Sequence, residues 1–217
     1  MHAQGTTGWQ LAAHANALII AGSETTGTLL SGLFYYTLSD SKIYSNLKSE
    51  IRSSFSSVDQ ITSRTATDLR YLNAVINETF RIYPPIPIGM PRVSSTDQLV
   101  SGYLVPRGTT VSVHMWSVTH NPANFRDPHQ FVPERWLGGS GYTDTLDASQ
   151  PFLLGTRACM GRNMAWIELR ILVAKLIWLF DFELVPGQHN WEAENKCFIL
   201  WEKPGLWVRS RSRTDLS

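Results

Sequence analysis

The sequence lacks the dense cysteine pattern of a secreted disulfide scaffold, because its 217 residues contain only two cysteines, Cys159 and Cys197. No secretory signal opens the chain, since its first residues include glycine and threonine but no apolar run. We therefore expect both thiols to be reduced, in an intracellular compartment. The cysteines also lack the Cys-x-x-Cys or Cys/His spacing that a zinc site requires.

An excess of charge is absent as well, because 19 Lys and Arg residues nearly balance 18 Asp and Glu residues. Binding to the phosphates of a nucleic acid needs a concentrated basic face, so the composition excludes a general nucleic-acid binder. Residues 209–213 hold three arginines among serines, a pattern typical of a solvated chain end. The 43% hydrophobic and 17% charged residues are typical of a soluble protein that buries a core.

One apolar run, Ala17 to Leu38, is about long enough to cross a bilayer. Glu24 lies inside this run, beside Ser23, Thr25 and Thr26. An ionised carboxylate near the middle of a membrane costs several kcal/mol. We therefore favour a buried helix of a globular protein over a membrane span.

The hydrophobic pattern predicts a mainly α-helical fold with small β-sheets. A long helix is expected over residues 9–38, interrupted by a polar notch at residues 23–26. An amphipathic helix is expected over residues 41–53, and a third helix begins after Asp68, which can cap it, and ends before Pro84. A final strong helix is expected over residues 161–180.

The expected strands are short. Two of them, residues 99–105 and 109–115, flank a Pro106-Arg107-Gly108 turn, and others are expected near residues 182–185 and 198–207. Prolines and a Gly138-Gly139 pair predict an irregular segment over residues 121–149. We see neither an internal repeat nor a convincing linker, so the sequence predicts one unit spanning residues 1–217.

The most informative segment is the string PFLLGTRACMGR. Its Cys159 directly precedes a long apolar helix, whose free N–H groups and partial positive charge stabilise a thiolate. Gly155 and Gly161 permit a close backbone approach to a flat ligand. Arg157 can pair with a carboxylate of that ligand, and Phe152 supplies an apolar wall. For any isolated cysteine of this kind, a small structural thiol is the alternative.

Two further patterns lie upstream of this string. Glu78 and Arg81 have the i, i+3 spacing that places both charges on one helix face, and Arg135 follows within the string FVPERW. A buried carboxylate is tolerable when guanidinium groups satisfy it with forked hydrogen bonds. Taken alone, Glu78 and Arg81 could equally form an ordinary surface ion pair.

The string AGSETT contains a hydroxyl and a carboxylate inside the long apolar helix. The Thr25 hydroxyl can bond to its own backbone and open the helix locally. A carboxylate in apolar surroundings, such as that of Glu24, has a raised affinity for protons and can relay them. A helix kink with a bridged glutamate is the alternative.

In combination these motifs resemble the cytochrome P450 family of haem-thiolate enzymes. Five residues of the chain match the family's Phe-x-x-Gly-x-Arg-x-Cys-x-Gly haem loop: Phe152, Gly155, Arg157, Cys159 and Gly161. The resemblance runs from about Trp9 to Val208 and is strongest to eukaryotic, fungal members. It implies the C-terminal half of the family's fold, from the distal oxygen-activation helix through the haem loop to the last strands. We therefore expect a truncated chain.

The resemblance also implies a set of roles. Cys159 would be the axial ligand of the iron of haem b, and Arg157 and Arg92 would hold its propionates. Thr25 and Glu24 would deliver protons. Glu78, Arg81 and Arg135 would form a structural network behind the haem. His114 and His120 are expected to be core or loop histidines rather than ligands.

The implied reaction is monooxygenation of a small, apolar organic substrate with O2. Electrons would come from an NADPH-dependent reductase, whose docking Arg162 could assist. Full-length relatives are expected at the endoplasmic reticulum membrane through an N-terminal anchor that this sequence is expected to lack. Two alternatives stay open: a haem-thiolate isomerase or dehydratase that needs no reductase, and a non-catalytic remnant with little or no haem binding.

Overall fold

Helices supply about half of the described chain, which covers residues 7–139 and 141–214 of this computed structural model. The predicted unit also includes residues 1–6, 140 and 215–217, which lie outside the described residues. The helices are α1 (Gly8–Ser39), α2 (Ser41–Ser54), α3 (Arg70–Ile82), α4 (Met115–Thr119) and α5 (Arg162–Leu179). Because the sheets between them are small, the predicted fold class is confirmed.

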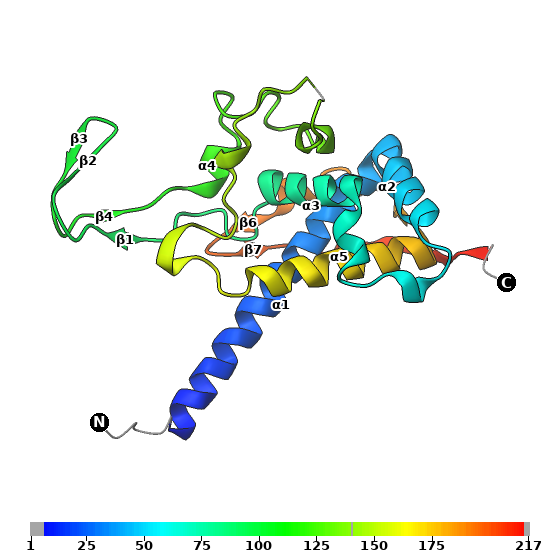
Figure 1. The fold of residues 1–217 in the computed structure, drawn as a ribbon, viewed down its shortest axis with the longest axis horizontal. Helices are drawn as coiled ribbons and strands as arrows, with labels where there is room; N and C mark the ends of the chain where they lie inside the picture. The colour runs from blue at the N-terminus through cyan, green and yellow to red at the C-terminus, as the bar shows by residue number, and fades with distance from the viewer. Residues whose placement is uncertain (1–6, 140, 215–217) are drawn as a thin grey trace.

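The helix α1 is packed over its C-terminal half only. Its buried residues begin at Thr28 and include Leu29 and Leu33, whereas Trp9 is 88% exposed and Ile19 is 66% exposed. In Figure 1 the N-terminal half extends away from the other elements. By length and composition this helix could cross a membrane, and 22% of its most apolar window is buried. The prediction of a buried helix is therefore wrong for residues 9–24.

The polar notch does not interrupt α1. The hydroxyls of Ser23 and Thr25 donate to the carbonyls of Ile19 and Ala21 at 2.7 and 2.6 Å, so the predicted bond from Thr25 to the backbone forms. The helix nevertheless continues through residues 23–26. Such a hydroxyl donates to the carbonyl four residues earlier, which already accepts a backbone N–H of the helix. Here both bonds form, and the helix stays continuous.

The core lies where α1, α2, α3 and α5 meet. The predicted apolar faces of α2 and α3 are both buried, and α5 contributes Leu169, Val173 and Ile177 to the same cluster. The predicted cap of α3 is wrong, because Asp68 ends the 3-10 helix η2 (Thr65–Asp68). The carboxylate of Glu50 on α2 instead accepts from the backbone N–H groups of Tyr71 and Leu72 at 2.7 and 2.8 Å.

The central strands pair differently from the prediction. The segment predicted as one strand over residues 99–105 is a hairpin of β2 (Gln98–Val100) and β3 (Tyr103–Val105). Its turn residues, Ser101 and Gly102, have φ of 49° and 84°, a conformation that reverses the chain. The following strand, β4 (Thr110–Val111), pairs with β1 (Arg92–Val93) instead.

Two further antiparallel strand pairs lie in the C-terminal part of the chain. The first joins β5 (Phe180–Leu184) to β8 (Val208–Ser212), and the second joins β6 (Lys196–Cys197) to β7 (Trp201–Glu202). Arg209 and Arg211 lie in the paired strand β8 and are exposed, as predicted for a solvated chain end, and Arg209 lies 3.3 Å from the carboxylate of Glu183.

Short 3-10 helices occupy several of the connections. They are η1 (Val58–Gln60), η3 (Pro133–Trp136), η4 (Leu146–Ala148), η5 (Gly155–Arg157) and η6 (Glu192–Glu194). As predicted, the described part of residues 121–149 is irregular, with only η3 and η4 as regular turns.

Candidate functional site

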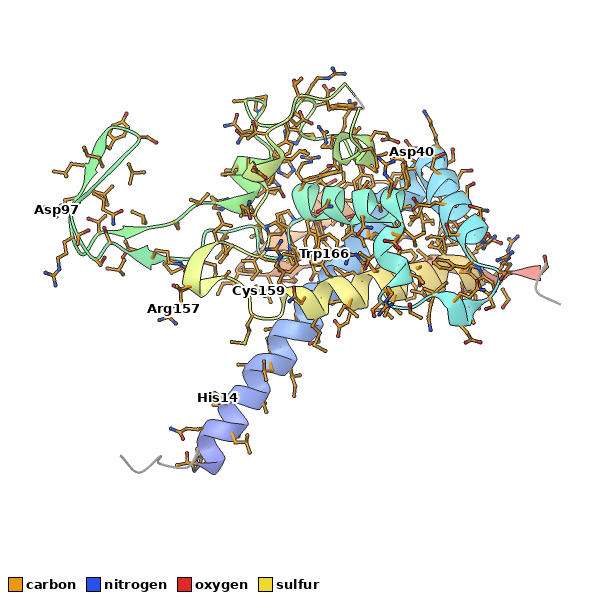
Figure 2. The ribbon with its side chains drawn as sticks, viewed as in Figure 1. His14, Asp40, Asp97, Arg157, Cys159 and Trp166 are labelled. Atoms are coloured by element: carbon orange, nitrogen blue, oxygen red, sulfur yellow. The ribbon has the colours of Figure 1, made fainter. Side chains whose placement is uncertain are left out.

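A cavity of about 270 Å³ lies between the middle of α1 and the loop that precedes α5. Cys159 and Thr25 both line it, although 134 positions separate them in the sequence (159 − 25). Figure 2 shows Cys159 where the loop enters α5. The walls are mostly apolar: Ala21, Thr26, Leu29, Phe80, Pro85, Ile86, Ile88, Met90, Met115, Pro151, Phe152, Leu153, Ala165 and Leu169.

Backbone hydrogen bonds fix the loop that carries Cys159. The N–H of Cys159 donates to the carbonyl of Phe152 at 2.8 Å, which closes the loop on itself. Gly155, with a φ of 77°, and Leu153, with a φ of 60°, supply the left-handed residues of the turn. The Cys159 side chain is exposed at the cavity. A Cβ at Gly161 would lie 3.8 Å from the sulfur, in ordinary van der Waals contact with the thiol.

Aromatic packing holds the same loop against α3 and α5. The ring of Phe152 meets Phe80 of α3 edge-on at 5.0 Å, and Phe80 lies 5.8 Å from Trp166 of α5. The guanidinium of Arg162 lies 5.9 Å from the centroid of Phe152. These contacts fix the position of the loop relative to the core, which a loop that presents a ligand requires.

The other residues predicted from the sequence take different positions. Arg157 lines the cavity with Cys159. Glu24 is exposed on α1 and does not belong to the cavity wall. Arg92 lies half-buried in β1, where its guanidinium donates to the carbonyl of Pro91 at 2.9 Å, and it also lies outside the wall. The structure therefore brings together Thr25, Arg157 and Cys159.

The predicted network of Glu78, Arg81 and Arg135 is present and buried. Both side-chain carboxylate oxygens of Glu78 accept from Arg81, at 2.8 and 2.9 Å, in a forked pair. Arg135 donates to the same carboxylate at 3.1 Å. Arg81 also donates to the carbonyls of Thr119, Pro128 and Gln130, so it ties α3 to the irregular segment.

Two members of this network were not identified from the sequence. The indole of Trp136 donates to Glu78 at 2.8 Å, and Asp144 pairs with Arg135. Trp136 adjoins Arg135 in the string FVPERW, so the motif carried a signal for it. No local pattern marks Asp144, because its contact depends on the path of the irregular segment.

His120 is a core histidine and His114 is an exposed loop histidine before α4, within the predicted choice of core or loop. His120 is buried and stacks on Trp116, with ring centroids 4.2 Å apart. Burial lowers its pKa to about 4, so the ring is neutral at physiological pH. The ring nitrogen of His114 lies 3.2 Å from the hydroxyl of Ser117.

The residues around the cavity fit the haem that the family resemblance implies. One thiol, one guanidinium and an apolar wall suit a flat, mostly apolar group that carries a metal and carboxylates. Within residues 7–139 and 141–214, no group of three or more His, Cys, Asp and Glu side chains is placed to hold a metal ion. A metal beside Cys159 would therefore take its remaining ligands from the group that carries it.

Comparisons with known proteins agree with this geometry. The family model described as Cytochrome P450 matches residues 4–208. The chain is 44% identical to the cytochrome P450 monooxygenase ORF9 of Penicillium roqueforti, over 94% of this chain and 40% of that protein. It is 42% identical to the trichothecene C-4 hydroxylase of Trichoderma arundinaceum, over 97% of this chain and 44% of that protein. The chain thus spans about two fifths of the length of these relatives.

Proposed function

This chain belongs to the cytochrome P450 family, and from that premise we propose that it forms the haem-binding part of a monooxygenase, as one unit from α1 to β8. Such an enzyme inserts one atom of O2 into an organic substrate. The monooxygenase and hydroxylase names of the relatives support this reaction class. The observation that carries the proposal is the cavity in which Cys159 and Thr25 lie on opposite elements.

In this proposal the thiolate of Cys159 would hold the iron of haem b. Gly161 keeps side-chain bulk away from the sulfur, and Phe152 shields it with an apolar ring. Gly155 allows the turn that presents Arg157 to one propionate, and Arg92 would hold the other. When bound, the haem supplies the iron at which O2 is activated, and a thiolate ligand favours cleavage of the O–O bond.

The chain's own groups handle protons and water. The Thr25 hydroxyl holds a proton at the cavity wall, where its oxygen donates to the Ala21 carbonyl at 2.6 Å. The exposed carboxylate of Glu24, the residue before Thr25 on α1, would take protons from solvent and pass them inward. The apolar wall excludes bulk water and suits a small, mostly apolar substrate.

Electrons would come from an NADPH-dependent reductase. Arg162 is exposed at the first residue of α5, close to the Cys159 loop, and would contribute positive charge to the docking face. For the longer protein, a location at the endoplasmic reticulum membrane follows from the family resemblance and is part of the proposal. We expect Arg162→Glu to slow reduction by the reductase while the haem content stays the same. Unchanged reduction would remove Arg162 from the docking face.

The deciding experiment is haem reconstitution of the purified chain, followed by reduction and addition of carbon monoxide. We expect the red-shifted absorption band that marks a thiolate-ligated haem. Cys159→Ser should abolish this band. Cys197→Ser is the matched control, because Cys197 is also exposed but lies on β6, away from the cavity, and it should leave the band unchanged.

Two results would contradict the proposal. A band that survives in Cys159→Ser would assign the iron to another residue. Absence of the band in the unaltered chain would instead favour the alternative, a remnant that binds little or no haem.

A further inference from the structure

A second cavity, of about 430 Å³, lies among α4, β7 and η6 and shares no lining residue with the cavity at Cys159. The short helix α4 lies between the two, because Met115 lines the first cavity and Trp116 the second. The second cavity is lined by Tyr35, Tyr83, Trp116, His189, Asn190, Glu192, Ala193 and Trp201.

The aromatic rings of this cavity are held in place by their neighbours. Trp201 stacks on Tyr83 with ring centroids 5.1 Å apart, and its indole donates to the carbonyl of Pro84 at 2.8 Å. The Tyr35 hydroxyl donates to the carbonyl of His189 at 2.9 Å. The Tyr83 hydroxyl accepts from the side chain of Asn195 at 3.0 Å. A ligand would therefore meet aromatic walls whose conformation is already fixed.

The charge of the cavity wall is negative. Glu192 supplies a carboxylate, and none of the described residues that line the cavity is a lysine or an arginine. Burial, followed by the charge of Glu192, raises the pKa of the Tyr35 and Tyr83 hydroxyls, so both tyrosines are neutral. The cavity wall thus combines neutral aromatic side chains with one anion.

We propose that this cavity binds an organic cation of the quaternary ammonium class. Such a cation is attracted to the electron-rich faces of Trp and Tyr and to a nearby carboxylate, and aromatic cages are a known way to bind it. A bare metal ion would instead need several oxygen ligands, which the cavity does not gather around Glu192. A neutral apolar ligand would make no use of the carboxylate.

The test compares two molecules of the same shape. Choline carries a trimethylammonium group, and 3,3-dimethylbutan-1-ol replaces its nitrogen with carbon, so it has the same bulk without the charge. Binding of each to the purified chain is measured by saturation-transfer NMR and calorimetry. We expect choline to bind about tenfold more tightly than the alcohol. Equal affinity for the two, or no saturable binding of choline, would overturn the proposal.

Matched variants locate the binding site. Glu192→Gln removes the cavity carboxylate, whereas Glu194→Gln makes the same change on the same 3-10 helix outside the cavity wall. Trp116→Leu removes one aromatic wall, whereas Trp9→Leu removes an exposed tryptophan of α1.

We expect only Glu192→Gln and Trp116→Leu to weaken choline binding, each by about threefold to tenfold. Equal losses in the control variants would overturn the assignment. Far-ultraviolet circular dichroism identifies any variant that fails to fold. None of these measurements requires haem, so their outcome is independent of the proposed monooxygenase function.

Discussion

Glu78 is a fully buried carboxylate whose charge is balanced by its immediate neighbours. Its oxygens accept from Arg81, Arg135, the indole of Trp136 and the backbone N–H of Val132. Removing an ion from water is costly, and the cost is offset only where such bonds satisfy it. The cluster therefore depends on every partner being present, and it holds α3 against the segment that leads toward the Cys159 loop.

Replacement of Glu78 by Gln should destabilise the chain strongly. The buried guanidinium of Arg81 would lose its counter-charge, whereas Arg135 would keep Asp144, and breaking a buried pair of this kind costs about 3–5 kcal/mol. Glu183→Gln is the control, since Glu183 pairs with Arg209 at the surface and should change the free energy of unfolding by less than about 1 kcal/mol. Denaturant unfolding followed by circular dichroism measures both, and similar values for the two variants would contradict this account.

A pH dependence is expected from His120. Its folded pKa, about 4, lies below the ordinary value of 6.5 because burial disfavours the charged ring. The unfolded chain therefore binds a proton that the folded chain does not. This contribution to stability is complete above about pH 6.5 and is lost as the pH falls toward 4.

The measurement is the free energy of unfolding between pH 4 and pH 7. His120→Gln should reduce the slope of the free energy of unfolding against pH by at most about 1.4 kcal/mol per pH unit. His14→Gln, which alters an exposed histidine of α1, is the matched control. An unaltered slope in His120→Gln would show that His120 titrates alike in both states.

At the scale of single residues, the sequence predicted those contacts that a short spacing between two residues determines. The spacing of Glu78 and Arg81 was enough to predict a pair, because three positions bring two side chains together on any helix. The exposure of Glu24 and the position of Arg92 outside the cavity wall depend on how whole elements pack, and no spacing encodes that. The contact between Asp144 and Arg135 was missed for the same reason.

Among the elements, the start of α2 is capped locally. One carboxylate oxygen of Asp40 accepts from the backbone N–H groups of Lys42 and Ile43 at 2.8 and 3.1 Å. Asp40→Ala should therefore cost about 1 kcal/mol of stability. The control is Thr7→Ala, which removes the cap of α1. Because the adjoining half of α1 is unpacked, its fraying should leave the free energy of global unfolding nearly unchanged.

Thermal and denaturant unfolding compare the two cap variants. A loss in Thr7→Ala as large as that in Asp40→Ala would mean that the first turns of α1 unfold together with the core.

The ends of an element were predicted well where a long hydrophobic periodicity marks it. They were predicted poorly where contacts with other elements fix the ends. The helices α2 and α5 begin and end within one residue of expectation. The cap of α3 was assigned to Asp68, but Glu50 of a neighbouring helix takes that role, and sequence distance hides such a partner. In the hairpin of β2 and β3, the Ser101-Gly102 pair did carry a turn signal, and the apolar residues on either side obscured it.

At the scale of the whole molecule, the cavity at Cys159 and the exposed half of α1 adjoin each other on the same helix. The middle of α1 contributes Ala21 and Thr25 to the cavity wall, and the turns before it carry apolar side chains into solvent. The family resemblance, not the spacing of the motifs, implied that this helix and the loop lie on the same site. It could not reveal how much of α1 is covered, since burial depends on which other elements are near.

The exposed turns of α1 should cause this chain to self-associate. Leu18, Ile19 and Ile20 are each about 60% exposed, and contiguous apolar surface of this kind drives association in water. Replacing all three by Gln should shift sedimentation velocity profiles toward the monomer without lowering the free energy of unfolding, because none of the three contacts the core. Leu29→Ala, at a fully buried position of the same helix, should instead cost about 2–5 kcal/mol and leave self-association of the folded chain in place. A triple variant that stays associated, or that unfolds as readily as Leu29→Ala, would show that these turns are covered by packing within the chain in solution.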